Sequence, residues 1–412
     1  MTSSLTCRFC HHDLTRTFVD LGMTPLANSY LHEERDIPAE KTYPLHARVC
    51  TNCFLVQVED VVPAEEIFSD YAYFSSYSSS WIAHAHAYAQ KLIDRLDLDE
   101  SSFVVEIASN DGYLLKHFVD KGVPVLGVEP AANVAKAAEE VGARTEVAFF
   151  GVETAQRLAR DGHLADLMVA NNVMAHVPDI NDFIGGVPIL LARDGVFTIE
   201  FPHLLNLIEK VQFDTIYHEH YSYLSLLTVE KILTAHGLKV FDVEELSTHG
   251  GSLRVYACHQ NSSEHPEATR LDALRKKEET AGLNSPAAYQ NFTPRVEKIR
   301  DDLVAFLTKA QAEDKKVAAY GAAAKGNTLL NYCTVNTELI DFVVDRNPEK
   351  QGTLLPGSHI PVFAPEKIWE AKPDYVLILP WNLADEITAD MAAIRDWGGQ
   401  FVIPIPELRV FS

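Results

Sequence analysis

Residues 217–225 combine several side chains that accept, donate or hold protons. The segment reads YHEHYSYLS, in which two histidines flank a glutamate and tyrosines stand on both sides. The ordinary pKa of histidine lies near neutrality, so an imidazole can abstract a proton under physiological conditions. A neighbouring carboxylate can orient that imidazole, and tyrosine hydroxyls can donate hydrogen bonds to an oxygen that becomes negatively charged. Such groups could remove a proton from a substrate and stabilise the negative charge that results.

Two other interpretations of this segment follow from the residues alone. In an extended chain His218 and His220 point to one face, so both could bind one metal ion, with His176 or His203 as a further ligand. The polar side chains could instead satisfy one another in a structural loop. The residues by themselves do not decide whether His218 or His220 would be the base.

Four of the six cysteines have the spacing of a zinc site. They form the pairs Cys7-Arg-Phe-Cys10 and Cys50-Thr-Asn-Cys53. Two intervening residues allow a tight turn that points both sulfurs at one ion. Four thiolates leave no position for water or substrate, so the predicted zinc is structural. It would stabilise an N-terminal module of roughly 60 residues, which has little core of its own.

Short β-branched runs separated by helical segments fill the middle of the chain and predict a doubly wound α/β sheet. The first run leads into the small Ala108 and then into Asn110 and Gly112. Small residues after a strand let the backbone approach a ligand closely. The second run ends in Glu129, 23 positions after Glu106, which is the distance expected of an acid that hydrogen-bonds ribose hydroxyls.

These strands resemble the ladder of a class I methyltransferase that uses S-adenosylmethionine. In that group a turn after the first strand lies under the methionine part of the cofactor, and an acid after the second strand binds the ribose. The resemblance implies cofactor contacts at Glu106, Ala108, Asn110, Gly112, Glu129, Pro130 and Asn172. Few glycines are needed because this cofactor has no phosphate, whereas the pyrophosphate of a dinucleotide must lie against a helix N-terminus.

A second α/β unit is expected at the C-terminus. Its turn YGAAAKGN, with Tyr320, Lys325 and Asn327, stands between an apolar strand and a helix. Backbone amides at such a turn, with one lysine, suit a diphosphate, so these three residues are predicted to bind the nucleotide end of a substrate. Asp345 ends the next strand, where a dinucleotide domain keeps its ribose acid, so an NAD-dependent oxidoreductase is the rival interpretation. The turn lacks G-x-G-x-x-G spacing, which favours a Rossmann-like domain without a redox cofactor.

Composition excludes several classes of function. The 412-residue chain is long enough for two or three domains, and its 58 acidic and 35 basic residues give a formal charge of −23. It lacks the excess of cations that a nucleic-acid partner requires. No apolar run approaches the roughly 18 residues of a membrane span, and the N-terminus lacks the pattern of a signal peptide. We therefore expect a monomeric, cytoplasmic protein without a membrane partner.

The order of parts is a zinc-binding module over residues 1–79, a methyltransferase domain with a helical connection over 80–300, and a C-terminal Rossmann-like substrate-binding domain over 301–412. With EIASNDGYLL, YHEHYSYLS and YGAAAKGNTLLNY, this order resembles the sugar C-methyltransferases of antibiotic deoxysugar pathways, and in form the C-3 methyltransferases of tetronitrose type. The resemblance covers essentially the whole chain. It implies methyl transfer beside the ketone of a 4-keto-6-deoxyhexose linked to a nucleotide, thymidine diphosphate, at C-3 or alternatively at C-5.

The same resemblance implies roles for five residues. His220 is the general base, and Glu219 and Tyr217 are its neighbours in the substrate pocket. Tyr71 in DYAYF and His176 in NNVMAHV match further active-site positions. Oxygen or nitrogen methylation, which needs no base over a carbon, is the alternative among methyltransferases, and a non-catalytic zinc-dependent scaffold is the alternative outside enzymes.

Overall fold

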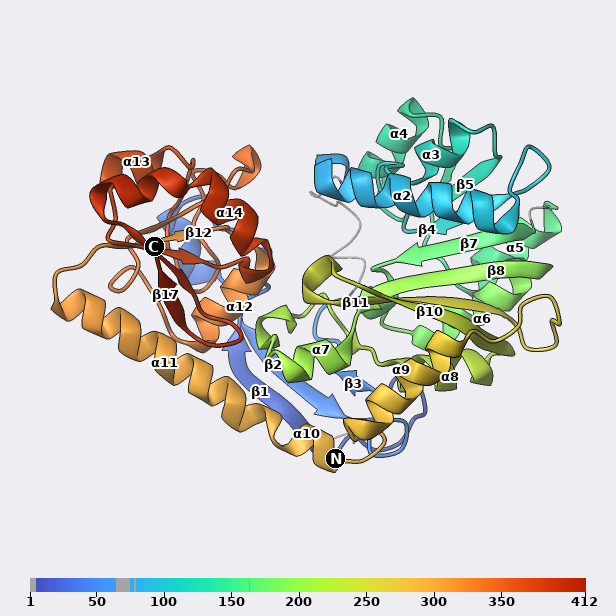
Figure 1. The fold of residues 1–412 in the computed structure, drawn as a ribbon, viewed down its shortest axis with the longest axis horizontal. Coiled ribbons are helices and arrows are strands. Elements are labelled where there is room, and N and C mark those ends of the chain that lie inside the picture. Colours follow the sequence, from blue (N-terminus) through green and yellow to red (C-terminus); the bar gives the residue numbers. More distant parts are fainter. Residues whose placement is uncertain (1–4, 64–74, 78, 163) are drawn as a thin grey trace.

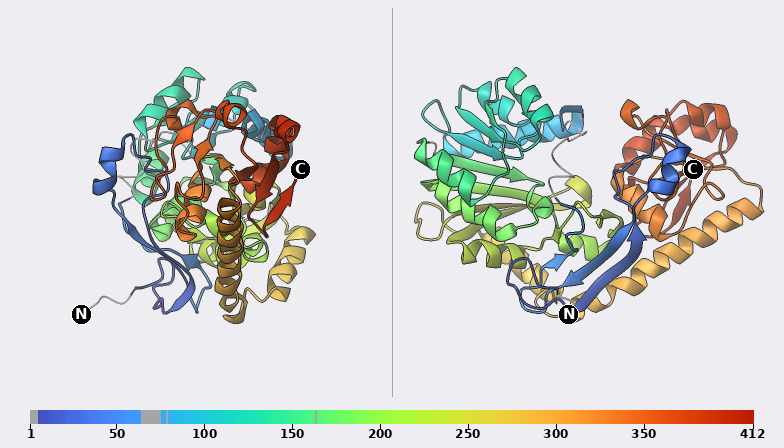
Figure 2. Two further views of the ribbon diagram at one scale, coloured as in Figure 1. Left: turned by 90° about the vertical axis from the view of Figure 1, so that its left-hand side faces the viewer. Right: turned by 180° about the vertical axis from the view of Figure 1, so that it is seen from behind.

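The computed structural model describes residues 5–63, 75–77, 79–162 and 164–412, which form three β-sheets with helices around them (Figure 1). The two larger sheets lie in separate lobes. The small N-terminal sheet runs alongside α11 (Phe292–Ala312) toward the C-terminal lobe (Figure 2). Within the described ranges, no helix is long and apolar enough to cross a membrane.

The central lobe is a seven-stranded sheet with the strand order of a class I methyltransferase. The order is β10-β11-β8-β7-β4-β5-β6, with β4 to β8 parallel and β11 antiparallel to both of its neighbours. This confirms the predicted fold class. The strands are β4 (Val104–Ile107), β5 (Val125–Val128), β6 (Thr145–Glu146), β7 (Ala165–Asn171), β8 (Leu191–Pro202), β10 (Leu238–Leu246) and β11 (Ser252–His259).

Helices cover both faces of this sheet because its strands carry apolar side chains on both sides. The predicted helix that opens the domain is α2 (Ser79–Leu96), which packs with α3 on one face, while α5, α6, α8 and α9 cover the other (Figure 1). The remaining elements are η2 (Ser75–Tyr77), α3 (Leu115–Val119), α4 (Ala132–Glu140), α5 (Val152–Arg160), η3 (Met174–His176), α6 (Ile180–Leu190), α7 (Leu204–Glu209), η4 (Phe213–Thr215), α8 (Leu226–Ala235) and η5 (Thr248–Gly250).

The C-terminal lobe confirms the predicted Rossmann-like unit. Its sheet has the order β14-β13-β12-β15-β16-β17, parallel except for β17. A helical connection, α9 (Thr269–Thr280), α10 (Ala287–Gln290) and α11, leads into it as expected. Its elements are β12 (Val317–Tyr320), α12 (Ala324–Tyr332), β13 (Phe342–Val344), η6 (Pro348–Lys350), β14 (Val362–Phe363), α13 (Lys367–Ala371), β15 (Tyr375–Ile378), η7 (Trp381–Leu383), α14 (Ala384–Asp390), η8 (Ala392–Trp397), β16 (Gln400–Ile403) and β17 (Arg409–Phe411).

The N-terminal sheet joins the two lobes. It consists of β1 (Arg16–Thr24), β2 (Tyr43–Val49), β3 (Val56–Gln57) and, from the middle of the chain, β9 (Ser222–Tyr223), all antiparallel, with η1 (Glu34–Ala39) between β1 and β2. Apolar residues of β1 and β2 share one core with α11 and with β12. The three-part division of the chain stays a prediction, and its boundary after residue 300 falls inside α11.

Four cysteine sulfurs meet at the end of the N-terminal sheet. The Sγ atoms of Cys7, Cys10, Cys50 and Cys53 lie within 4.8 Å of one another, and Cys7–Cys53 and Cys10–Cys50 are both 3.5 Å apart. In a tetrahedral site with Zn–S bonds of about 2.3 Å the sulfurs are roughly 3.8 Å apart, so this donor set fits zinc. The Gln57 amide donates to Cys7 Sγ at 3.2 Å, as outer-sphere partners of metal ligands do.

The shared core predicts that one aromatic side chain on β1 stabilises the whole protein. Phe18 is 1% exposed, and its ring stacks on Phe292 of α11 with centroids 4.3 Å apart. Phe18→Ala should lower the free energy of unfolding by about 3–5 kcal/mol, because it leaves a cavity in that core. Met23→Ala on the same strand, where the side chain is 61% exposed, should change it by about 0.5 kcal/mol or less. Urea denaturation checks both, and equal losses would contradict the shared core.

The cysteine cluster predicts the behaviour of zinc. Cys50→Ser should reduce zinc from one ion per chain toward none and lower the melting temperature, because a three-thiolate site holds the metal less tightly. Cys258→Ser removes another buried cysteine, on β11, and should leave the zinc content unchanged. Elemental analysis of the purified proteins measures both, and full zinc content in Cys50→Ser would show that the four cysteines are not the ligands.

Candidate active site

The turn after β4 has a backbone suited to close approach by a ligand. Ala108 and Asn110 have φ angles of 52° and 51°, and Gly112 has a φ of 75°. The left-handed region is uncommon for residues other than glycine and persists where the surrounding structure requires it. Ala108 and Asn110 therefore adopt the left-handed conformation that is ordinarily found at glycine.

Three buried carboxylates gather at the same edge of the sheet. Glu129, after β5, accepts hydrogen bonds from the backbone N–H groups of Asn110 and Ala131, both at 2.9 Å. Burial raises the pKa of Glu129, and burial together with the charges of Glu129 and Asp111 raises the pKa of Glu106 well above its ordinary value. Since these carboxylates destabilise one another's charge, a positively charged ligand would be favoured here.

Several buried oxygen atoms at this edge have no hydrogen-bond partner among the described residues. They are Glu106 Oε2, Ser109 Oγ, Asp111 Oδ1, Asn171 Oδ1 and Asn172 Oδ1. Unpaired buried acceptors are costly unless a ligand or water pairs with them. Asn172, with a φ of 56°, directly follows β7, the neighbour of β4 in the sheet, and Pro130 leads from Glu129 toward α4. A ligand that carries positive charge and donor groups fits this edge.

The segment YHEHYSYLS places His220 beside His176 and Tyr217. The Nδ1 of His220 lies 2.9 Å from the carbonyl oxygen of Thr215, and its Nε2 lies 2.7 Å from the hydroxyl of Tyr217. Because a carbonyl only accepts, the ring proton is on Nδ1, and Nε2 keeps the lone pair. The rings of His176 and His220 are 4.6 Å apart at an angle of 72°, and His176 Nδ1 is held by the carbonyl of Glu219 at 2.8 Å.

His218 points the other way. Its Nε2 lies 3.3 Å from the carbonyl oxygen of Pro44, and its ring packs against Tyr43 of the N-terminal sheet. His203 does not join the two facing histidines either, because its Nε2 contacts the buried Glu278 at 2.7 Å. In the part of the chain that the structure describes, the four cysteines are the only cluster able to hold a metal ion. The histidine metal site is therefore not supported, and the geometry favours His220 over His218 as a base.

The surroundings keep both facing imidazoles neutral. Burial, the nearby His176 and the charge of Lys325 lower the pKa of His220 well below its ordinary value. Burial lowers the pKa of His176 to about 4. Glu219, whose Oε1 accepts a hydrogen bond from Asn28 at 2.7 Å, has its pKa raised by burial. His220 is thus available as an unprotonated base at neutral pH.

Of the three residues predicted to bind a nucleotide, the structure places one beside this site. Lys325 is half-buried and lies close enough to lower the pKa of His220. Tyr320 is buried in the core of the C-terminal lobe. Asn327 is buried too, and its amide donates to the carbonyl of Ala27 at 2.7 Å. Tyr71 lies outside the described residues.

The structure adds residues that the sequence did not single out. Trp381 Nε1 donates to the buried Asp214 at 2.7 Å, and the Trp381 ring lies 5.1 Å from Lys325 Nζ. Burial raises the pKa of Asp214 to about 6, and Lys325 opposes this rise. His249 in η5 also influences the pKa of His220. Each is a single polar or aromatic residue in an ordinary context, so no spacing pattern could have identified it.

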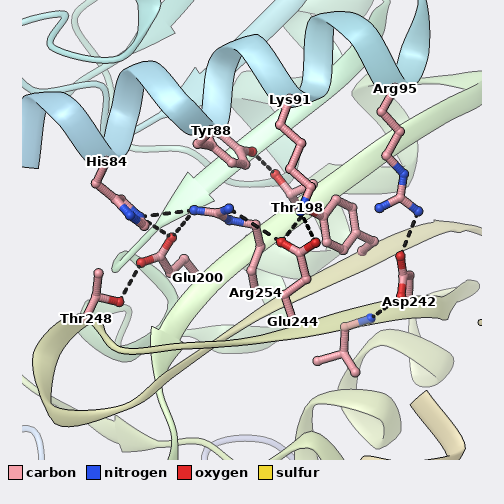
Figure 3. A network of polar contacts seen from close by, with 12 residues as sticks. His84, Tyr88, Lys91, Arg95, Thr198, Glu200, Asp242, Glu244, Thr248 and Arg254 are labelled. Atoms are coloured by element: carbon pink, nitrogen blue, oxygen red, sulfur yellow. Dashed lines mark hydrogen bonds and ion pairs between the residues drawn. The ribbon is translucent and has the colours of Figure 1, made fainter. Parts of the chain in front are cut away.

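A buried ionic network fixes α2 to the sheet beside this edge (Figure 3). Glu200, fully buried on β8, accepts hydrogen bonds from Arg254 at 2.7 Å and from Thr248 at 3.0 Å, and contacts His84 of α2 at 3.1 Å. Lys91 and Arg95 of α2 form ion pairs farther along, with Glu244 and Asp242 respectively. His84 of α2 therefore belongs to this network, since it contacts both Glu200 and Arg254.

Asp345, the acid of the rival dinucleotide interpretation, is hydrogen-bonded within the C-terminal lobe. Asp345 accepts a hydrogen bond from the backbone N–H of Ala322 at 2.7 Å and another from Asn347 at 2.8 Å. The carboxylate thus holds the turn before α12 through hydrogen bonds to backbone groups of the protein. Lys350 also stabilises this turn, because its Nζ donates a hydrogen bond to the carbonyl of Ala322 at 2.7 Å.

Comparison with known proteins is consistent with this architecture. Family models match in order along the chain: a zinc binding domain at residues 7–68, a methyltransferase domain at 81–243 and a C-methyltransferase C-terminal domain at 247–406. The chain is 37% identical to the C-methyltransferase NovU of Streptomyces niveus over 406 residues, which are 98% of this chain and 96% of that protein.

Solved structures give a partial likeness. The PH0226 protein of Pyrococcus horikoshii OT3 is 14% identical, with 47% of this chain and 97% of that chain covered and a TM-score of 0.38. Magnesium protoporphyrin IX methyltransferase of Synechocystis PCC 6803 is 16% identical, with 43% and 83% covered and a TM-score of 0.35. The assignment therefore rests on the sequence relative and on the three domains in order. The chain belongs to the C-methyltransferase family, an enzyme family that depends on S-adenosylmethionine.

Proposed function

We propose that this C-methyltransferase acts on a 4-keto-6-deoxyhexose linked to thymidine diphosphate and methylates C-3, beside the ketone. The observation that carries the proposal is the state of His220. A neutral imidazole with a fixed tautomer lies beside a second histidine and a tyrosine, at the junction of all three parts of the protein. Methylation of oxygen or nitrogen would not require a base placed over a carbon, whereas a carbon beside a ketone must lose a proton before it can attack a methyl group.

In this proposal Nε2 of His220 takes the proton from C-3, and the electron pair of that C–H bond moves into an enolate. The Thr215 carbonyl holds Nδ1–H and stabilises the imidazolium that forms. The Tyr217 hydroxyl, which donates to Nε2 in the resting site, turns to the enolate oxygen when substrate displaces it. Glu219 contacts a sugar hydroxyl. When bound, S-adenosylmethionine supplies an electrophilic methyl group.

The acid-rich edge of the sheet is assigned to S-adenosylmethionine. Its sulfonium and ammonium groups carry the positive charge that Glu106, Asp111 and Glu129 favour, and its ribose hydroxyls can donate to Glu129. Ala108 and Gly112 bring the backbone close to the methionine part through their positive φ angles. Asn172 supplies an unpaired amide oxygen at the end of β7.

The nucleotide end is assigned to the C-terminal lobe. A groove of about 360 Å³ opens at the carboxyl edge of that sheet, and Lys325 contacts two of its lining residues, Trp381 and Asn382. It is lined by Trp381, Asn382, Asp385 and Arg409, among others, so one basic and one acidic side chain face it. In open α/β sheets ligands bind at this edge, outside the carboxyl ends of the strands. Lys325 would then reach the diphosphate that joins nucleoside to sugar.

The cofactor assignment predicts a loss of affinity in Glu129→Gln. Removing the charge weakens the hydrogen bonds to the ribose by about 1.5–3 kcal/mol, which raises the Kd for S-adenosylmethionine about 10- to 150-fold. Glu146→Gln, on the neighbouring strand and paired with Arg157, should leave the Kd within about twofold. Isothermal titration calorimetry measures both, and an unchanged Kd for Glu129→Gln would remove Glu129 from the cofactor site.

The assignment of the base predicts the exchange of one substrate hydrogen. With S-adenosylhomocysteine bound, methyl transfer is blocked, and the wild-type protein in D₂O should exchange the C-3 hydrogen of the thymidine diphosphate 4-keto-6-deoxy sugar. His220→Asn should slow this exchange by at least about 10²-fold. His218→Asn, two residues away and turned toward Pro44, should retain it. Because the pKa of His220 lies well below 6.5, the wild-type rate should not fall between about pH 8 and 6.5.

Proton NMR follows this exchange directly. Exchange at C-5 instead of C-3 would correct the position of methylation while keeping the base. Exchange that persists in His220→Asn would exclude that residue as the base. If no 4-keto sugar nucleotide exchanges, the enzyme methylates a different class of substrate.

A further inference from the structure

The loop at η5 holds one residue in an unfavourable backbone conformation. His249 has a φ of 53° and a ψ of 26°, in the left-handed region, and Gly250 follows with a φ of 87°. A Cβ atom on Gly250 would lie 2.5 Å from the ring of Trp381 in the C-terminal lobe. The loop between β10 and β11 therefore packs directly against the C-terminal lobe. Such backbone outliers concentrate at functional positions.

The same loop is anchored from behind. The Thr248 hydroxyl donates to the buried Glu200, which Arg254 and His84 also hold (Figure 3). The Ser252 hydroxyl donates to the Thr248 carbonyl at 3.0 Å. Glu200 is thus a positioning residue for the loop, and the backbone of His249 is fixed on both sides.

The His249 side chain lies against α2. It reaches solvent, and its ring lies 5.4 Å from that of Trp81 at an angle of 80°. Partial desolvation and the charge of Lys325 lower the pKa of His249. The groups that face it are Lys325 from α12, Glu200 from β8, His84 from α2 and His176 from η3.

Lys325 is the matching group on the opposite lobe. Its Nζ lies over the Trp381 ring and 3.4 Å from Asn382 Oδ1. Among the described residues, no carboxylate lies within ion-pair distance of it. Burial lowers its pKa, and the nearby Asp214 opposes that change. Trp381 therefore contacts both the His249 loop and this weakly compensated cation.

We propose that His249 and Lys325, one from each lobe, together bind a negatively charged oxygen of the sugar-nucleotide substrate, so that the substrate itself links the two lobes. This inference rests on the proposed function. The oxygen belongs either to the diphosphate or to the enolate that forms at the ketone. A diphosphate bound beside His249 would offset the charge of Lys325 and raise the pKa of the imidazole, so binding would take up a proton.

The test compares His249→Asn with the wild-type protein. Asparagine tolerates the left-handed region, so the loop should keep its shape. His11→Asn is the matched control, because His11 is also an exposed histidine with a positive φ, of 59°, and lies on the zinc-binding module. If His249→Asn does not fold, His249→Gly replaces it, since glycine adopts this conformation without cost. Melting temperature and the Kd for S-adenosylmethionine should match the wild type.

Two ligands then separate the two sources of the oxygen. If the bound oxygen belongs to the diphosphate, the Kd for thymidine diphosphate should rise at least about tenfold in His249→Asn. The proton uptake measured by calorimetry in phosphate and Tris buffers should then be lost. If the oxygen belongs to the enolate, the Kd for thymidine diphosphate should be unchanged, and exchange of the C-3 hydrogen of the 4-keto sugar should slow at least about tenfold. Either result supports the inference.

The contrary results are distinct from a failure of the proposed function. If wild type exchanges the sugar hydrogen and His249→Asn stays within twofold of it in both assays, the role of His249 is overturned while the proposed function stands. If wild type neither binds thymidine diphosphate nor exchanges any 4-keto sugar, the proposed function fails, and this inference fails with it.

Discussion

One segment, residues 213–223, is hydrogen-bonded to all three parts of the protein, and the reaction site depends on it. Toward the C-terminal lobe, Asp214 accepts a hydrogen bond from Trp381. Toward the N-terminal part, Glu219 accepts one from Asn28, and β9 pairs with β3. A histidine after β7 contacts a backbone carbonyl of the segment. The imidazole that we assign as base therefore belongs to a segment that the N-terminal sheet and both lobes hold in place.

Several residues near the proposed cofactor and substrate sites have unfavourable local structure. Ala108, Asn110, Asn172 and His249 all have positive φ angles, and buried oxygens near three of them lack partners. In the ionic network around Glu200, by contrast, the buried charges of Glu200 and Arg254 are paired with each other. The charges around Glu200 are paired, whereas buried oxygens at the carboxyl edge of the central sheet are unpaired. This difference indicates that a ligand binds at the carboxyl edge. The cost is offset when cofactor and substrate bind.

The sequence predicted the parts of this protein that depend on local patterns. Cysteine spacing identified the zinc ligands, and strand periodicity gave both α/β sheets, because each signal lies within a short stretch of chain. Contacts between distant residues could not be predicted. Nothing around Asp214 or His249 indicates that Trp381 will meet both of their segments. Tyr320 was assigned to a binding turn, yet it ends a strand and its side chain enters the core, since alternate residues of a strand face opposite sides.

The most direct test of the central claim is a crystal structure with S-adenosylhomocysteine and the unmethylated thymidine diphosphate 4-keto-6-deoxy sugar bound. We predict that the sugar lies against residues 213–223, with C-3 within about 3.5 Å of His220 Nε2, and that the nucleotide extends onto the C-terminal lobe past Lys325. A sugar bound away from that segment, or one with a hydroxyl or amino group rather than C-3 directed at the cofactor, would contradict the account.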